Sequence, residues 1–194
     1  IPLRKTHYVS QDETELKSLE KVVSWNFENE EDCKQWKVLA KSTPPVYNAE
    51  EKALCGSTTD PDGHIMPISC NIDASKVKYL HFVMKVDKSN ASSGEIYFKT
   101  NPDASYTAAM GKGFTVIADG EYHDYYVDLS ALTTWTGNIV ALRFDPINVI
   151  GNYYIKSFEF LSYISENSLT VNVDGMENVL TPYDYTIENG ELYV

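Results

Sequence analysis

Residues 128–160, DLSALTTWTGNIVALRFDPINVIGNYYIKSFEF, decide the fold of this chain. They contain two apolar-rich segments, 139–145 and 153–161, separated by a short loop. In the first segment every second residue is apolar, which is the period of a β-strand with one buried face. The opposite face carries Arg143 and Asp145, which are costly to bury and suited to binding a polar ligand.

The same period extends outward along the chain. Alternating or short apolar segments predict further strands at 23–27, 36–40, 53–57, 79–87, 95–100, 114–118 and 122–129. Turn signals separate these segments, for example TDPDG at 59–63. Short strands between turns, with no long helical period, predict an all-β fold, an antiparallel β-sandwich. Trp25, Trp36 and Trp135 are expected to pack in its core.

Composition divides the chain into three parts. Residues 1–21 are polar and charged, and we expect a leading arm or linker there. Residues 22–163 hold the predicted sandwich. Residues 164–194 contain two more strand patterns, LTVNVD and GELYV. This last part is either a β extension of the sandwich or the start of a second small β module, and we favour the second.

Charge and hydropathy exclude several classes of function. The 194 residues are 43% hydrophobic, which suits a globular domain with a sizeable core. The formal net charge of −12 argues against binding to nucleic acid or anionic membranes, whose phosphates need Lys and Arg. No apolar run is long enough to span a membrane. The three cysteines form no disulfide framework, although one pair with a leftover thiol stays open.

A set of aromatic and polar side chains falls on the outward phase of the predicted strands. Sugar rings have apolar faces and equatorial hydroxyls, so a sugar site needs aromatic platforms and planar polar groups. The candidate ligand-binding residues are Tyr97, Lys99, Tyr126, Arg143 and Asp145 on strands, and Tyr106 on a loop at the rim. These residues form one binding surface if their strands are neighbours in one sheet. Tyr79, His81 and Lys85 are also outward-facing by alternation. The alternative is an ordinary solvent face with a stabilising Arg–Asp pair.

Three groups of residues occur in the order found in one protein family. They are WNFE at 25–28 with Trp36, DP at 60–61 with IDAS at 72–75, and WTGNI at 135–139 with LRFDP at 142–146. Together they resemble the jelly-roll carbohydrate-binding modules with a galactose-binding-like fold, over residues 22–163. The resemblance implies a two-sheet sandwich, a structural calcium ion, and a glycan site on the concave sheet or the loop rim. It also implies a secreted or cell-surface bacterial protein, since such modules are appended to extracellular glycoside hydrolases.

Several carboxylates could hold such a calcium ion, which takes about six to eight oxygen ligands. The candidates are Glu28, Asp32, Asp60, Asp62 and Glu159. We expect Glu28 and Glu159 to be the metal ligands, because the first and last strands of such folds often neighbour each other. The alternative is plain surface acidity. Where many relatives have an Asp after the Ile of the last strand, this chain has Lys156, a departure that weighs against the cation site.

No motif for catalysis stands out in the sequence. The two opposed carboxylates of a glycosidase are not marked by any pattern, and serine-hydrolase, zinc and phosphate-loop signatures are absent. We therefore expect a non-catalytic module that binds a polysaccharide and lies beside neighbouring domains of a larger multidomain protein. The alternative is a structural or protein-interaction sandwich with no glycan site.

Overall fold

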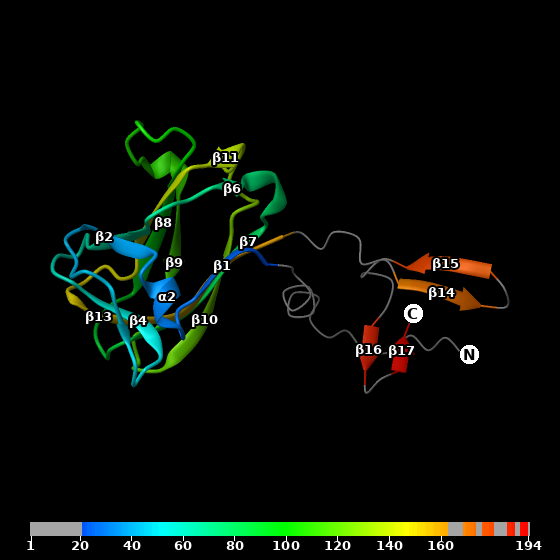
Figure 1. Cartoon of the computed structure of the whole chain (residues 1–194), viewed down its shortest axis with the longest axis horizontal. Coiled ribbons are helices and arrows are strands. Elements are labelled where there is room, and N and C mark those ends of the chain that lie inside the picture. The colour runs from blue at the N-terminus through cyan, green and yellow to red at the C-terminus, as the bar shows by residue number, and fades with distance from the viewer. Residues whose placement is uncertain (1–20, 163–168, 174–175, 181–185, 189–190, 194) are drawn as a thin grey trace. The chain divides into compact units, whose positions relative to one another are not determined.

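Alternating apolar residues fold the part of the chain from 21 to 161 into two antiparallel β-sheets (Figure 1). The structure is a computed structural model that describes residues 21–162, 169–173, 176–180, 186–188 and 191–193. Residues 21–161 form one compact unit, and the described strands after residue 162 belong to another. All but Lys21 of the predicted leading arm lies outside the described residues.

Sheet A has six strands in the order β10-β7-β13-β4-β3, with β1 also paired to β13. Their bounds are β1 Lys21–Asn26, β3 Val46–Asn48, β4 Ala53–Thr58, β7 Tyr79–Val86, β10 Tyr122–Asp128 and β13 Gly151–Leu161. β13 is the long central strand, and its partners β1, β4 and β7 are all antiparallel to it. The first and last strands of the sandwich are therefore neighbours, as predicted.

Sheet B has five strands in the order β2-β5-β12-β8-β9. Their bounds are β2 Trp36–Ala40, β5 His64–Pro67, β8 Ser93–Lys99, β9 Gly111–Thr115 and β12 Ala141–Asp145. Short elements lie between these strands: α2 Glu30–Cys33, η1 Ala74–Lys76, η2 Ala108–Met110, and the paired strands β6 Ile72–Asp73 and β11 Asn138–Ile139. No helix in the described part of the chain is long and apolar enough to span a bilayer.

The second unit contains two described hairpin-like pairs. β14 Leu169–Val173 pairs with β15 Met176–Leu180, and β16 Thr186–Glu188 pairs with β17 Glu191–Tyr193. The predicted strand patterns LTVNVD and GELYV thus correspond to β14 and β17. The Asp-Gly and Asn-Gly turn signals at 174–175 and 189–190 lie outside the described residues.

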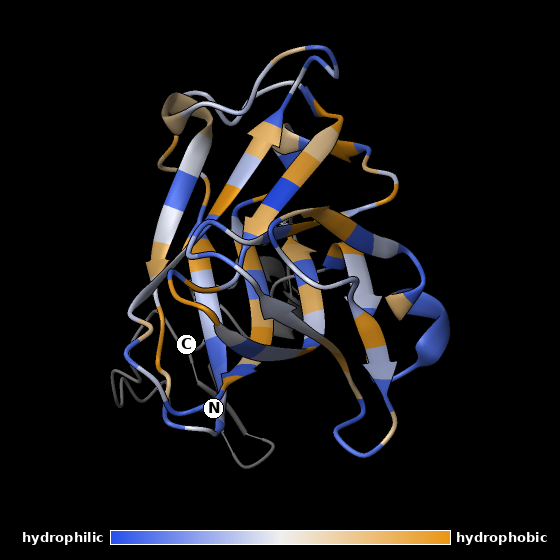
Figure 2. Ribbon diagram, turned by 90° about the vertical axis from the view of Figure 1, so that its left-hand side faces the viewer, coloured by the Kyte–Doolittle hydropathy of each residue, from blue (hydrophilic) through white to orange (hydrophobic). Residues whose placement is uncertain are grey.

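The core of the sandwich is built from the inward phase of both sheets. Hydrophilic and hydrophobic bands alternate along the strands, as Figure 2 shows. Phe82 of sheet A and Phe144 of sheet B are fully buried, with ring centroids 5.2 Å apart. Phe158 of β13 lies 5.1 Å from Phe144 and completes an aromatic contact between the two layers. This arrangement confirms the predicted antiparallel β-sandwich.

The three tryptophans pack in the core as expected. Trp25, Trp36 and Trp135 are 6%, 4% and 6% exposed. Trp36 contacts the rings of Trp25 and Phe158 edge to face, at centroid distances of 5.4 and 4.9 Å. Within the described residues the three cysteines are unpaired.

Two strands of sheet B differ from the sequence expectation. No strand was predicted at residues 64–67, but β5 forms there, because β12 and β2 pair with it from both sides. β9 starts at Gly111 instead of residue 114, because its backbone pairs with β8 from Gly111 opposite Tyr97 onward. Both differences arise because a partner strand supplied the stabilisation that local sequence did not.

Candidate functional site

Five of the six predicted ligand-binding residues lie together at sheet B. On β12, Arg143 is paired with Tyr97 of β8, and Ala141 is paired with Lys99. Their neighbours Leu142, Phe144, Ile96 and Phe98 are completely buried, so alternation turns Arg143, Tyr97 and Lys99 to the outer face of the sheet. Asp145 follows Arg143 on the same phase. We call this surface the sheet B face.

Arg143 is the centre of the sheet B face. Its Nε donates to Asp145 Oδ1 at 2.8 Å, and its Nη2 donates to Asp145 Oδ2 at 2.5 Å and to Asp62 Oδ1. Its guanidinium carbon lies 5.1 Å from the centre of the Tyr97 ring, within range of a cation–π contact. Among the hydrogen bonds between described residues none uses Nη1, and the side chain is 18% exposed. Arg143 is thus fixed in place with one amino group left for another acceptor.

Burial and pairing act against each other at Asp145. The carboxylate is only 5% exposed, and burial raises its pKa, while the hydrogen bonds and charge of Arg143 act to lower it. The pKa of Arg143 is raised, chiefly by its hydrogen bonds to Asp145. The net direction for Asp145 is upward, so the carboxylate depends on Arg143 to remain ionised.

The Cδ1 and Cε1 atoms of the Tyr97 ring pack against Gly111 of the neighbouring strand β9. A Cβ atom on Gly111 would lie 2.5 Å from the Tyr97 ring, so only glycine leaves room for it. The Tyr97 hydroxyl donates to Glu95 Oε2 at 2.9 Å. Burial, followed by this hydrogen bond, raises the pKa of Tyr97 to about 12. The phenol therefore stays protonated, and the ring is fixed at both of its ends.

Tyr106 joins the sheet B face from the loop before β9. Its hydroxyl donates to the carbonyl of Leu142 at 3.0 Å, which ties the loop to β12. The Lys99 ammonium lies 4.2 Å from the centre of the Tyr106 ring. Tyr106 and Lys99 thus form a second aromatic and cationic pair on the same face, beside Tyr97 and Arg143.

Tyr126 is the predicted site residue that the structure separates from the others. It lies on β10 of sheet A, opposite His81 of β7. Its outward side chain points away from sheet B, on the far side of the core. The prediction of a single binding surface is therefore corrected: Tyr79, His81, Lys85 and Tyr126 belong to the outer face of sheet A. Alternation predicted correctly that these side chains face outward. The order of the strands depends on pairings that the sequence does not reveal.

On sheet A, His81 connects three strands. Its Nε2 lies 2.7 Å from Asp124 Oδ1 of β10, and its Nδ1 lies 3.2 Å from Glu159 Oε2 of β13. Lys21 Nζ lies 2.5 Å from the other oxygen of Glu159, and the Tyr126 ring stacks on the imidazole at 4.3 Å. Burial acts to lower the pKa of His81, but the hydrogen bonds to Glu159 and Asp124 raise it overall.

We expect the stability of this protein to fall as pH rises through the raised pKa of His81. A folded-state pKa above the unfolded value of about 6.5 means that the stabilisation is complete below that pH and is lost above the folded pKa. Neutral imidazole donates from only one nitrogen, so one carboxylate loses its contact. Thermal unfolding between about pH 5 and pH 9 measures this fall, and His81→Gln should remove it. An unchanged pH profile in that variant would contradict the assignment.

The predicted calcium ligands Glu28 and Glu159 lie at the turn after β1 and on β13. Glu159 is opposite Ser24 on β1, whereas the backbone beside Glu28 pairs near Lys156, since the amide of Phe27 donates to the Lys156 carbonyl. Lys21 and His81 already occupy the oxygens of Glu159. The assignment of Glu28 and Glu159 as metal ligands stays a prediction.

Another group of metal-ligating side chains converges. The ligand atoms of Asp62, His64 and Asp145 lie within 4.8 Å of one another, and this cluster could hold a metal ion. It fits calcium poorly, because it offers two carboxylates and one nitrogen, whereas calcium prefers oxygen ligands. The guanidinium of Arg143 also bridges both carboxylates, and Lys41 lies 2.9 Å from Asp62. An internal cation already balances these charges.

Sequence reasoning missed two members of the sheet B face. Asp62 was considered only as a calcium ligand, although it binds Arg143 from a turn 81 residues away. Glu95 holds the Tyr97 hydroxyl from two residues before it on the same strand, a spacing that was visible in the sequence. The second could have been found from alternation alone; the first depended on β5 being a strand.

Comparisons with known proteins identify the fold. A scan against protein-family models finds no match, and neither does a search of curated proteins. Solved structures do match. The family 11 carbohydrate-binding module of the cellulosomal cellulase Lic26A-Cel5E of Clostridium thermocellum is 14% identical with a TM-score of 0.52, over 77% of this chain and 97% of that one.

Two other matches are also carbohydrate-binding modules, but their TM-scores are lower. The mannan-recognising module TmCBM27 is 14% identical with a TM-score of 0.46, over 74% of this chain and 98% of that one. A mutant family 29 module is 16% identical with a TM-score of 0.44, over 66% and 81%. The family 11 module, with a TM-score of 0.52 at 14% identity, shows the fold of this chain. This chain therefore has the jelly-roll β-sandwich fold of the family 11 carbohydrate-binding module, the fold that its sequence predicted.

Proposed function

We propose that this chain is a non-catalytic carbohydrate-binding module that binds a neutral polysaccharide on the sheet B face. The observation that carries the proposal is the preorganised pair of Tyr97 and Arg143. The ring packs against Gly111, and the guanidinium carbon lies over the ring at 5.1 Å from its centre, with Nη1 left unpaired among the described residues. An apolar sugar face stacks on the ring, and a hydroxyl oxygen accepts from Nη1.

The remaining residues of the face suit the same ligand. Lys99 and Tyr106 provide a second ammonium and aromatic pair on the same surface. Glu95, which accepts from Tyr97, is exposed and has another oxygen for a sugar hydroxyl. Because these groups are already held by one another, little side-chain entropy is lost on binding. Affinity for a single module is expected to be modest and to increase when several modules bind one polymer.

The carboxylates of the face support binding over catalysis. Glycoside hydrolysis needs two carboxyl groups on opposite sides of a glycosidic bond. Asp62 and Asp145 instead converge on the same guanidinium.

We also propose, from the resemblance to carbohydrate-binding modules, that the chain belongs to a secreted or cell-surface bacterial protein with further domains.

One observation favours the alternative, a structural sandwich with no glycan site. Three of the hydrogen bonds of Arg143 go to carboxylates of this chain, which is what a purely stabilising pair would show. Under that alternative the sheet B face meets a neighbouring domain. Binding to soluble polysaccharides separates the two functions.

We expect Tyr97→Ala to weaken polysaccharide binding at the sheet B face about tenfold or more, because the ring supplies apolar contact surface for a sugar. Affinity gel electrophoresis with mixed-linkage β-glucan, xylan and mannan measures this as reduced retardation. Gly111→Ala should have a similar effect, since its Cβ would displace the ring without removing it. Tyr154→Ala, a half-buried tyrosine of sheet A, is the matched control and should bind normally. No retardation of the unmodified protein on any neutral glycan would reject the proposal.

A further inference from the structure

The edge of sheet A carries an exposed aromatic ring, Tyr126, that the proposed function does not use. Tyr126 is 41% exposed, although it lies within a strand. β10 is the terminal strand of sheet A, and β7 is the strand beside it among those described. One face of the Tyr126 ring stacks on His81 of β7, with an angle of 18° between the planes. The other face is therefore turned outward, beyond the edge of the sheet.

His81 keeps this ring in position. Carboxylates on two different strands hold both of its nitrogens, at 2.7 Å for Asp124 and 3.2 Å for Glu159. The imidazole cannot rotate without losing these contacts, so the Tyr126 ring rests on a fixed support. A platform that is already ordered costs little entropy when a ligand stacks on it.

Two carboxylates flank the platform on the same strand. Asp124 and Asp128 are two residues before and after Tyr126, so alternation places all three side chains on one side of β10, about 6.6 Å apart. Asp124 uses one oxygen for His81, and Asp128 uses one for Ser130 at 2.9 Å. Each carboxylate retains a second oxygen with no hydrogen-bond partner among the described residues. Hydroxyl donors suit such acceptors.

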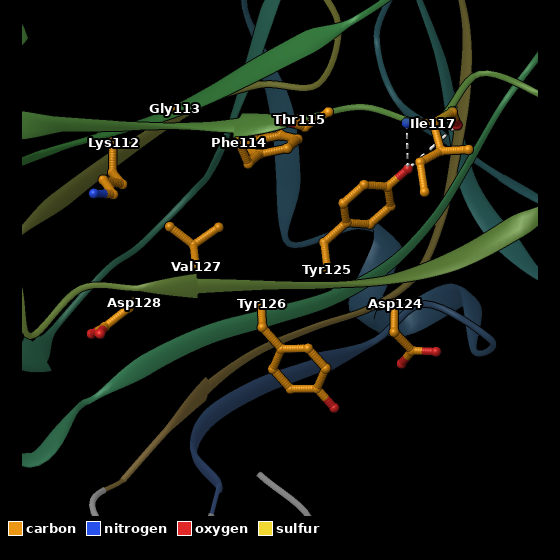
Figure 3. Close-up of a pocket in the computed structure, with 10 residues that line it drawn as sticks. All are labelled: Lys112, Gly113, Phe114, Thr115, Ile117, Asp124, Tyr125, Tyr126, Val127 and Asp128. Atoms are coloured by element: carbon orange, nitrogen blue, oxygen red, sulfur yellow. Dashed lines mark hydrogen bonds between the residues drawn. The ribbon is translucent and has the colours of Figure 1, made fainter. Parts of the chain in front are cut away.

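A groove runs beside the platform, between the edge strands of the two sheets. It has a volume of about 480 Å³ and is lined by β9, β10 and Ile117. Figure 3 shows Tyr125 and Val127 pointing from β10 into the groove, and Tyr126 and Asp124 pointing from the opposite side of the same strand. Figure 3 also shows Lys112 on β9, the strand on the other side of the groove. A ligand with more than one ring can therefore stack on Tyr126 and extend across β10 towards the groove.

We infer that this β10 edge is a second glycan-binding site, specific for a neutral oligosaccharide. An exposed aromatic face with flanking acceptors matches a pyranose, which has an apolar face and hydroxyl donors around it. An acidic glycan would be repelled by Asp124 and Asp128. The inference rests on the proposed function for its ligand class, but it uses none of the residues of the sheet B face. The two sites lie on different sheets, so one molecule would bind two polysaccharide chains.

Calorimetric titration of the full chain with neutral tetrasaccharides tests this inference. Mixed-linked gluco-, xylo- and manno-tetrasaccharides are the probes. We expect two sites for each unmodified chain, one site in Tyr126→Ala and one site in Tyr97→Ala, with the remaining affinity unchanged. Tyr126→Phe keeps the ring and should retain both sites, which controls for folding. The unmodified protein should also increase the turbidity of a soluble polysaccharide by cross-linking it, and neither alanine variant should.

The outcomes distinguish the two proposals. A single site that Tyr97→Ala abolishes and Tyr126→Ala leaves intact would overturn the second site and keep the proposed function. A single site with the reverse response would keep the β10 edge and overturn the sheet B face. Absence of binding to every probe, or binding that both variants leave unchanged, would overturn both.

Discussion

Replacing Phe82 with alanine will lower the free energy of unfolding of the sandwich by about 3–5 kcal/mol. Phe82 is fully buried on β7, at the middle of the core. Its ring lies within 5.0–5.7 Å of four other rings, those of Phe114, Tyr125, Phe144 and Phe158. These rings come from both sheets, so a cavity at this position cannot close without moving one layer against the other. The cost includes lost burial and unfilled volume.

Urea unfolding, monitored by far-UV circular dichroism and by tryptophan fluorescence, measures the loss of stability in Phe82→Ala. Ile117→Ala is the matched control, because Ile117 is 46% exposed and its removal should cost less than about 0.5 kcal/mol. Equal losses in the two variants would contradict the assignment of Phe82 to the centre of the core. Both variants should keep the same slope against urea if the unfolded states are equally exposed.

Arg143→Met will destabilise the protein by about 3 kcal/mol near neutral pH, because it leaves the buried Asp145 carboxylate without its partner. The figure is at the low end of the range for a buried pair, since Arg143 is 18% exposed. Burial already raises the pKa of Asp145, and without Arg143 this pKa rises further. A carboxyl whose folded pKa lies above its unfolded value destabilises the fold once it must ionise. The loss should therefore shrink towards about pH 4, where Asp145 takes up a proton.

Two further variants test the cause of that loss. Asp62→Asn removes the exposed partner of Arg143 and should cost less than about 1 kcal/mol, as most solvent-exposed pairs do. The double variant Arg143→Met/Asp145→Leu should recover most of the stability, because both halves of the pair are replaced by apolar groups. A loss that is the same at both pH values, or no recovery in the double variant, would show that Asp145 is not the cause.

This result determines how the binding site should be probed. Arg143 contributes to stability as well as to the sheet B face, so a loss of binding in an Arg143 variant cannot be separated from unfolding. Tyr97 lacks this complication, because it is half-buried and hydrogen-bonds to the exposed Glu95, so that no buried charge depends on it. Substitution of Tyr97 is therefore the cleaner test of the proposed function.

The sequence by itself determined the fold class and the direction of most side chains. Period-two alternation on β7, β8 and β12 placed Phe82, Phe98 and Phe144 inward and Tyr97 and Arg143 outward. Inward and outward positions follow from the backbone geometry of a single strand, since successive side chains point to opposite faces. That information is local, so it can be obtained from residues adjacent in the chain.

Only the tertiary structure decided which outward side chains share a face. Tyr126 and Tyr97 have the same phase, yet β10 pairs with β7 in sheet A and β8 pairs with β12 in sheet B. Arg143 meets Asp62 across 81 residues because β5 lies beside β12. Such pairings depend on free energies summed over whole sheets, and no short segment of sequence contains that sum. For this physical reason one predicted binding surface became two separate faces.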